Sequence, residues 1–431
     1  MIGTSNGVFQ DGYVQALEEC GAFRSFANFS VGGCSAELAA YRLTTFDLSQ
    51  FDVCVLELGC NDGLFLRNGE TSVEHVELAL FDAVAKVLDG GALPALLLMP
   101  IQQCIPSGDE IRAIFRRVSA KLQAPLFDGY SMLEQLAKRG INPHDLFVDK
   151  VHLVREVAYA FGEAFAVALT LSLPASLEFR PARFARSRHT FLPATGLGLA
   201  ADRVAQKKTA LLASDIVNCE AGDRLTVPTP PGTRVTAVVF DAASSCSVIE
   251  LTGWITQRFR LTTEMLNLDG GPLRVTVWPA HWIRGEEGAV SVSFLRDGPT
   301  TVQRWWGPPQ RTPPVAGLIG VVVGETPQPS AVPIPIGIKC DLNAQLPQQR
   351  YADLAKDFDI SVEERIVISL YRTLLTRSPD PIGLEANVNI LREQDVTEGV
   401  CTILSRILAS DEYRTRHGGG PPMEVRMAMR R

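Results

Sequence analysis

Apolar strand-like runs alternate with amphipathic helix-like runs through residues 1–175 of the chain. The runs "DVCVLELG" at 52–59 and "LPALLLMP" at 93–100 are almost wholly apolar, which is typical of strands covered on both faces. Further strands are predicted at "RSFANFS" (24–30) and "APLFDGY" (124–130). Because strands that alternate with helices build a parallel sheet, this part of the chain is predicted to form a three-layer α/β domain.

Helices are predicted between these strands, where apolar residues recur at three- and four-residue spacing. They are "SAELAAYRL" (35–43), "SVEHVELALFDAVAKVLDGG" (72–91) and "GDEIRAIFRRVSAKLQ" (108–123). The glycine pair that closes the second of them is a typical helix stop. A last helix is expected after His152, where it completes the domain.

The texture of the sequence changes near residue 200. From 200 to 306, short β-branched runs with roughly alternating polarity are separated by Gly, Pro and Asp, which predicts an antiparallel β-sandwich or barrel. Proline-rich sequence at 307–352 is predicted to be an extended linker with at most one short strand. Apolar periodicity then predicts a small all-α domain at 355–416, so the chain is expected to be multidomain.

Charge and cysteine content exclude several classes of protein. A net charge of -7 without a Lys/Arg-rich face argues against nucleic-acid binding. No run of about eighteen apolar residues occurs, so no transmembrane segment is expected. The 9 cysteines are scattered without close pairs, which favours buried free thiols over disulfides or a zinc site, and neither a metal nor a cofactor is expected. The thiols and the lack of a secretory signal favour the cytoplasm, with a secreted or envelope protein as the alternative if the start is incomplete.

Four short motifs fall where a parallel sheet places its active site, at the carboxyl ends of strands. In chain order they are "IGTSNG" with Ser5, "NFSVGGCS" with Gly33, "ELGCNDG" with Asn61, and "VDKVHL" with Asp149 and His152. Ser5 enters a helix whose amides would stabilise a serine alkoxide. A glycine N–H and the Asn61 amide are donors suited to a developing oxyanion. Asp149 can fix the imidazole tautomer of His152 while the other ring nitrogen accepts the serine proton.

Each of these residues also has a purely structural interpretation. A serine before a helix is often an N-cap, and a histidine near a helix start is often a surface residue. Asn61 could form an Asx-turn, and Gly33 could belong to an ordinary loop. Their joint occurrence at successive strand ends, with the D-x-x-H motif last, favours the catalytic interpretation.

The order and spacing of the motifs resemble those of the SGNH or GDSL serine hydrolases, and the resemblance spans about residues 1–170. It implies a flavodoxin-like α/β fold. It also implies that Ser5 is the nucleophile, with His152 and Asp149 as the base and its orienting carboxylate. The oxyanion hole implied by the resemblance consists of Gly33, Asn61 and the backbone N–H of Ser5.

Two features depart from the pattern of that family. The aspartate of its first motif is replaced by Thr4, and only Met1 and Ile2 remain of the strand before the serine. Because that aspartate mainly supports the turn, its loss is expected to weaken the motif without removing a catalytic group.

Other candidate side chains are predicted to take no part in catalysis. His75 is expected on a solvated helix face, and His144 is expected in a loop, with lining of the pocket as the alternative. Cys34 and Cys60 adjoin the proposed oxyanion donors and are expected to be small buried thiols.

All 5 tryptophans fall within the β-rich region and its exit. Trp254 and Trp278 are predicted to be core residues of the sandwich. Trp282, Trp305 and Trp306 lie next to turns and the proline-rich segment, and are candidate exposed platforms on which sugar rings could stack. The domain at 200–306 is therefore a candidate carbohydrate-binding domain.

The C-terminal domain resembles a small bacterial helical domain of unknown function with the signature Y-R-x-L-L-x-R-x-x-D-x-x-G. The matching residues are Tyr371, Arg372, Leu374, Leu375, Arg377, Asp380 and Gly383. The resemblance implies an envelope or glycan context without chemistry, and the polar residues are expected to build the turn between helices.

These observations predict a serine-dependent carbohydrate O-acetylesterase that forms an acyl-enzyme. The expected partner is an acylated carbohydrate or another ester. Alternatives are a polysaccharide O-acetyltransferase using the same triad, a lipase or thioesterase, and a non-catalytic glycan-binding envelope protein.

Overall fold

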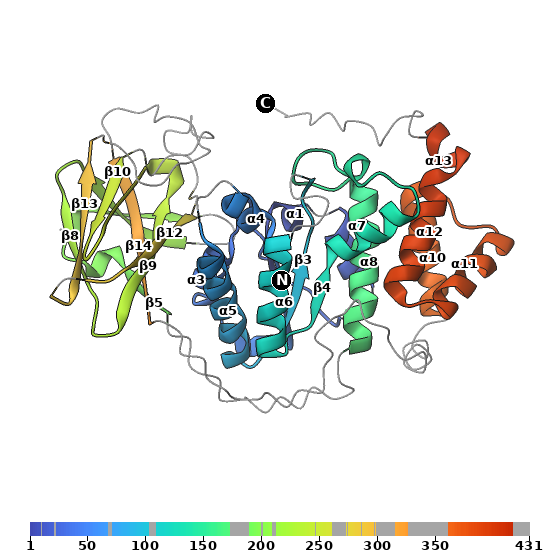
Figure 1. Cartoon of the computed structure of the whole chain (residues 1–431), viewed down its shortest axis with the longest axis horizontal. Helices are drawn as coiled ribbons and strands as arrows, with labels where there is room; N and C mark the ends of the chain where they lie inside the picture. The colour runs from blue at the N-terminus through green and yellow to red at the C-terminus, as the bar shows by residue number, and fades with distance from the viewer. Residues whose placement is uncertain are drawn as a thin grey trace.

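The computed structural model describes residues 1–9, 11–20, 23–67, 71–102, 109–172, 189–199, 201–208, 213–245, 247–260, 273, 275–285, 287–296, 298, 315–325 and 361–416. Strands of a β-sandwich lie at one end of the molecule, a sheet flanked by helices lies in the middle, and the C-terminal helices lie at the other end (Figure 1). The chain is thus multidomain, with an α/β part, as the sequence predicts.

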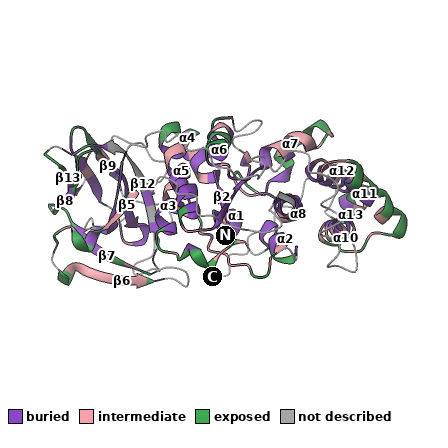
Figure 2. Cartoon of the chain, turned by 90° about the horizontal axis from the view of Figure 1, so that it is seen from below, coloured by how far each residue is buried: buried purple, intermediate pink, exposed green. Residues whose placement is uncertain are grey.

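The first part of the chain forms a parallel sheet in the order β1-β2-β3-β4. Its strands are β1 (Ile2–Gly3), β2 (Val53–Leu58), β3 (Leu93–Leu98) and β4 (Leu126–Asp128). All residues of β3, and all of β2 except its first, are buried, because helices cover the sheet on both faces (Figure 2).

Helices pack on both faces of this sheet (Figure 1). One face carries α3 (Ala36–Leu43), α5 (Val73–Asp89) and α6 (Asp109–Leu122), and the other carries α2 (Tyr13–Glu19), α7 (Gly129–Lys138) and α8 (Arg155–Ser172). Successive strand residues point to opposite faces, so Leu56 enters the core beneath α3, α5 and α6, while Val55 enters the core beneath α2, α7 and α8. Two short helices, α1 (Ser5–Val8) and α4 (Cys60–Arg67), begin close behind β1 and β2.

The strand predicted at 24–30 is not formed as a strand. The segment nevertheless runs beside β1, because the Phe29 N–H donates to the Met1 carbonyl and the Val31 N–H donates to the Gly3 carbonyl, each at 2.9 Å. β1 has only two residues, so its partner segment obtains too few ladder bonds to form a regular strand.

The middle part of the chain forms two antiparallel sheets that share a core, which is the predicted sandwich. The first sheet has the order β11-β10-β13-β8, and the second has the order β12-β9-β14-β7-β6, with β5 also paired to β14. The strands are β5 (His189–Pro193), β6 (Val204–Lys208), β7 (Ala213–Glu220), β8 (Arg224–Pro228), β9 (Thr233–Asp241), β10 (Val248–Thr252), β11 (Thr256–Arg260), β12 (Val275–Ile283), β13 (Ala289–Leu295) and β14 (Val315–Glu325).

The sandwich extends beyond the bounds of 200–306 that the sequence predicts. β5 precedes residue 200, and β14 lies inside the stretch predicted as a linker at 307–352. β14 pairs with β5, β7 and β9, so it is an interior strand of its sheet and not part of an extended connection. The remainder of 307–352 lies outside the described residues.

The second sheet packs against the helices α3 and α5. Ala237 and Val239 from β9 share a hydrophobic core with residues of both helices. The ring centroids of Tyr41 in α3 and Phe191 in β5 are 4.6 Å apart. The sandwich is therefore attached to the α/β part through an apolar contact.

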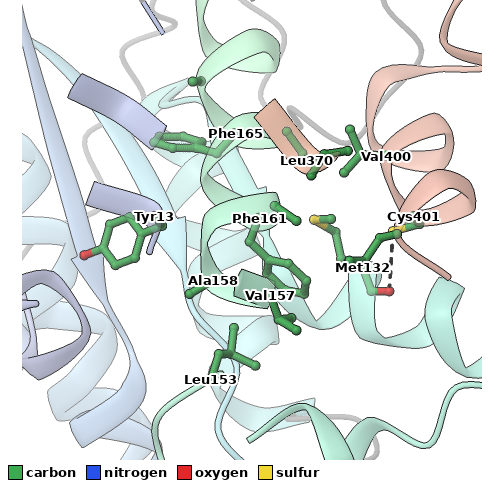
Figure 3. Close-up of a cluster of buried hydrophobic side chains, with 14 of the residues drawn as sticks. Tyr13, Met132, Leu153, Val157, Ala158, Phe161, Phe165, Leu370, Val400 and Cys401 are labelled. Atoms are coloured by element: carbon green, nitrogen blue, oxygen red, sulfur yellow. Dashed lines mark hydrogen bonds between the residues drawn. The ribbon is translucent and has the colours of Figure 1, made fainter. Parts of the chain in front are cut away.

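The C-terminal helices dock on the opposite side of the α/β part, against α7 and α8 (Figure 3). They are α10 (Val362–Leu375), α11 (Pro381–Glu393), α12 (Val396–Ala409) and α13 (Asp411–Arg416). Phe161 and Phe165 of α8 belong to the same hydrophobic cluster as Leu370 and Val400 of the C-terminal helices (Figure 3). Asp380 caps α11 by accepting from the Gly383 N–H at 2.8 Å, which is the turn-building role expected for the C-terminal signature.

The thiols agree with the prediction of buried free cysteines. Those described are free and buried: Cys20, Cys34, Cys54, Cys60, Cys219 and Cys401. Among the helices that the structure describes, none combines the length and apolarity needed to cross a bilayer.

Candidate active site

Ser5 lies at the turn between β1 and α1, at the carboxyl edge of the parallel sheet. Thr4 is the N-cap of α1, and its hydroxyl accepts the Asn6 N–H at 3.3 Å, so Ser5 occupies the first helical position. The N-cap is therefore Thr4, whereas the structural interpretation of the motif would require Ser5, and the hydroxyl of Ser5 remains available for another partner.

That partner is His152, which comes from the loop before α8. The His152 Nε2 lies 2.8 Å from the Ser5 Oγ, although 147 residues separate the two. The other ring nitrogen, Nδ1, lies 2.7 Å from the Asp149 Oδ2. An ionised carboxylate can only accept, so Nδ1 carries the proton and Nε2 is left to accept the hydroxyl proton of Ser5. The three side chains therefore form a continuous relay from hydroxyl to imidazole to carboxylate.

Asp149 is itself held by its own loop. Its Oδ1 accepts the backbone N–H groups of Val151 and His152, each at 2.8 Å. Partial burial by itself would raise the pKa of Asp149, but the hydrogen bonds from the His152 ring and from these amides lower it below the ordinary carboxyl value. Asp149 is thus ionised near neutral pH and aimed at His152.

The two remaining motifs form adjoining loops. Asn61 is the second residue of α4, and its Nδ2 donates to the Cys34 carbonyl at 2.8 Å, next to Gly33. Gly33 has a φ of 77°, a conformation that favours glycine. Within the described residues, no hydrogen bond engages the backbone N–H of Ser5 or of Gly33. Both N–H groups therefore have no protein acceptor among the described residues, and the carbonyl bond of Asn61 uses only one of its two amide hydrogens.

Asp62 joins these two loops, a role that the sequence analysis missed. This buried carboxylate accepts the Ala36 N–H at 2.9 Å and the Gly59 N–H at 3.1 Å. One oxygen therefore holds the start of α3 and the other holds the turn before Asn61. Burial raises the pKa of the Asp62 carboxyl, while the same backbone donors lower it.

A second group of missed residues lies around His152. The Phe9 ring meets the His152 ring edge-on, with centroids 5.4 Å apart, and the Arg155 guanidinium lies 3.3 Å from the Phe9 centroid. Arg155 also pairs with Asp11 at 3.4 Å. These contacts restrict the imidazole ring, and no sequence motif signals them because they join segments far apart in the chain.

The other candidate side chains have structural roles. His144 is exposed, but it lies in a short 3-10 helix at Pro143–Leu146 and not in an irregular loop. The solvated position predicted for His75 is wrong, because His75 is buried with its Nδ1 3.1 Å from the Ser72 Oγ. Burial raises the pKa of Cys34 to about 12 and that of Cys60 well above its ordinary value, so both remain thiols unsuited to nucleophilic attack. Among the residues described, no cluster of His, Cys, Asp or Glu is arranged to hold a metal ion.

The predicted core position of Trp254 is wrong. Trp254 lies in the turn between β10 and β11 with 64% of its surface exposed, and the Arg284 guanidinium is 4.3 Å from its ring centroid. The adjacent Ile255 is 52% exposed. Trp278 and Trp282 lie on β12, but their side chains are outside the described part of the structure, as are Trp305 and Trp306 entirely.

Comparisons with known proteins give a likeness of fold. No protein-family model matches the chain, and no curated protein matches it. A two-domain esterase active on acetylated mannans, co-crystallised with mannopentaose, has 14% sequence identity and a TM-score of 0.50, and the alignment covers 76% of this chain and 90% of that one. A second structure of a two-domain esterase active on acetylated mannans has 13% identity, a TM-score of 0.50, and coverage of 76% and 91%. A structure of TesA has 21% identity and a TM-score of 0.31 over 39% of this chain and 95% of that one.

Proposed function

We propose that this chain is a serine-dependent carbohydrate O-acetylesterase. The observation that carries the proposal is the hydrogen-bonded relay of Ser5, His152 and Asp149, brought together from the two ends of the α/β part. A hydroxyl held by an imidazole, which is in turn held by a carboxylate, is the arrangement that activates serine in acyl transfer.

The reaction starts when the Ser5 Oγ attacks the carbonyl carbon of the ester. His152 Nε2 takes the hydroxyl proton as the Oγ–C bond forms, and Asp149 stabilises the resulting imidazolium. The tetrahedral intermediate collapses, the C–O bond to the sugar breaks, and His152 returns the proton to the departing sugar oxygen. Water then attacks the acetyl-enzyme with His152 as base, which releases acetate and restores the Ser5 hydroxyl.

The oxyanion of both tetrahedral intermediates requires donors fixed before the reaction. In this proposal they are the N–H groups of Ser5 and Gly33, which have no acceptor among the described residues, and the second amide hydrogen of Asn61. Asp62 holds the loops that carry Gly33 and Asn61, so their positions are independent of substrate.

A carbohydrate ester is the substrate class that the rest of the chain favours. The two-domain esterase that shares this fold acts on acetylated mannans. The exposed Trp254 offers an aromatic face next to Arg284, and an aromatic face stacks well on the apolar face of a sugar ring.

The proposal is tested by measuring acetate release from an O-acetylated polysaccharide and nitrophenol release from 4-nitrophenyl acetate. Wild-type chain should hydrolyse both. Trp254→Ala should raise KM for the polysaccharide by about two- to tenfold, the equivalent of roughly 0.5–1.5 kcal/mol of lost aromatic stacking, while leaving kcat/KM for the small ester unchanged. Equal polysaccharide kinetics in both proteins would contradict the role of Trp254, and transfer of acetyl to an added sugar in place of its release would show an acetyltransferase.

Asn61→Ala tests the oxyanion hole. Removing one donor to the oxyanion should lower kcat by about 10²–10³-fold with little change in KM, because the donor acts on charge that develops only in the transition state. The matched control is Asn142→Ala, which removes an exposed side-chain amide whose oxygen accepts the His144 N–H at 3.3 Å. A fall of less than about threefold in Asn61→Ala, or an equal fall in the control, would contradict the assignment.

A further inference from the structure

Glu57 is a fully buried carboxylate in β2, directly behind the turn that carries Ser5. It accepts the Thr4 N–H at 2.6 Å, the Thr4 hydroxyl at 2.9 Å and the Tyr13 hydroxyl at 3.2 Å. The Cys60 thiol lies 4.0 Å from its other oxygen. All these partners in the described structure are neutral, so the carboxylate is stabilised by hydrogen bonds and not by a cation.

Gly3 leaves room for the contact between Glu57 and Thr4. In the parallel ladder Gly3 lies opposite Glu57, and a Cβ at Gly3 would approach the Glu57 Oε2 to 2.7 Å. The absence of a side chain at Gly3 therefore lets the carboxylate reach past β1 to Thr4.

Thr4 connects Glu57 to Asn6, the residue after the nucleophile. Its hydroxyl donates its proton to Glu57 and accepts the Asn6 N–H at 3.3 Å. The Asn6 side chain then donates to the Val151 carbonyl at 3.3 Å, beside the catalytic base His152. The residues on both sides of Ser5 are thus fixed by one chain of hydrogen bonds that starts at Glu57 and ends next to His152.

We propose that Glu57, acting through Thr4, is the positioning residue of the nucleophile turn and holds Ser5 at hydrogen-bonding distance from His152. This inference rests on the proposed function, since it concerns the same Ser5. The Glu57 and Thr4 pair provides the support that an acidic first-motif residue would provide, so replacement of that aspartate by Thr4 leaves the turn anchored. Thr4 suits this position because its hydroxyl both donates to the carboxylate and accepts from the helix.

The burial of the Glu57 carboxylate changes its pKa. Burial and the nearby Asp62 carboxylate raise the pKa of Glu57, the bonds from Thr4 and Tyr13 lower it, and the result is a pKa of about 7. At neutral pH the carboxyl is therefore only partly ionised, and the donors that it positions favour the ionised form.

The test compares Thr4→Val, Thr4→Ser and Glu57→Gln with wild type on 4-nitrophenyl acetate. Thr4→Val keeps the shape of the side chain but removes both hydrogen bonds of the hydroxyl, and we expect kcat to fall about 10- to 100-fold with KM unchanged. Thr4→Ser keeps the hydroxyl and should retain wild-type kcat within about threefold, which a role in packing alone would not explain. Glu57→Gln should lower kcat to a similar extent. The double variant Thr4→Val/Glu57→Gln should have a kcat no lower than that of the less active single variant, because both changes break the same Thr4–Glu57 interaction.

The matched control is Glu163→Gln, which neutralises another fully buried carboxylate. Glu163 lies on α8 and pairs with Arg365 at 3.2 Å, outside the Glu57 network. Its kcat should stay within about threefold of wild type. An equal loss of kcat in Glu57→Gln and Glu163→Gln, or wild-type kcat in Thr4→Val, would overturn the proposal.

Hydrogen exchange of the N-terminal peptide provides a readout that does not depend on ester hydrolysis. The amides of Thr4 and Asn6 should exchange slowly in wild type and at least about tenfold faster in Thr4→Val and Glu57→Gln. Unchanged exchange would overturn the anchoring role even in an active enzyme. Faster exchange in the variants of a chain that hydrolyses no ester would support the anchoring role and reject the proposed function.

Discussion

Ser5→Ala should abolish ester hydrolysis while leaving substrate binding intact. Removal of the hydroxyl eliminates the nucleophile and the partner of the His152 Nε2, so no acyl-enzyme can form. We expect kcat to fall roughly 10⁴- to 10⁶-fold with KM changed by less than about threefold, since the serine contributes to the transition state and little to ground-state binding. Steady-state hydrolysis of 4-nitrophenyl acetate, together with loss of labelling by a fluorophosphonate, measures this.

A second serine in the same part of the chain provides the control for this change. Ser49 is exposed, and its hydroxyl donates to Asp47 at 2.6 Å. Ser49→Ala should keep wild-type kinetics and labelling. Residual activity above about one hundredth of wild type in Ser5→Ala would mean that another group carries out the attack, and an inactive wild type would favour a binding module over an enzyme.

The helices and strands that could be predicted from the sequence are those in which successive residues lie in the same kind of environment. The strands at Val53–Leu58 and Leu93–Leu98 are apolar, with Glu57 as the exception, because helices cover both of their faces. β14 is also a buried apolar run, but proline-rich sequence on both sides of it resembles a linker, and its pairing with β9 comes from a segment far away in the chain. The segment at 24–30 has the composition of a strand, yet its neighbour β1 is too short to pair with it fully.

Some residues of the candidate site could likewise be predicted from the sequence, and others could not. Ser5, Asp149 and His152 could be proposed from spacing, because each motif follows a strand end or precedes a helix. Glu57 could not, since it occurs inside an apolar run and its environment depends on the space left by Gly3 on the neighbouring strand. The stacking of Arg155 on Phe9 and the exposure of Trp254 likewise depend on packing between distant segments, for which the local sequence has no signal.

Asp149→Asn should lower kcat by roughly 10⁴-fold, and the reason lies in the two different sets of bonds made by its carboxylate. One oxygen accepts the N–H groups of Val151 and His152, and the other accepts the His152 ring. In the variant, the amide oxygen is retained by the two backbone donors, so the amide NH₂ group faces the His152 Nδ1 and donates to it. The imidazole then carries its proton on Nε2, and it cannot accept the Ser5 proton.

Asp149→Asn is therefore expected to lower kcat more than Asp149→Ala does. Alanine also removes the anion, but water can occupy its place and accept from Nδ1, so part of the population keeps the productive tautomer. Asp145→Asn is the control, because it removes the same charge from an exposed position in the same loop and should leave kcat unchanged. The measurement is kcat for 4-nitrophenyl acetate at a pH well above the ordinary carboxyl range, where the lowered pKa of Asp149 keeps the wild-type carboxylate ionised. If Asp149→Asn retained more activity than Asp149→Ala, control of the tautomer would not be the function of Asp149, and its contribution would be the negative charge alone.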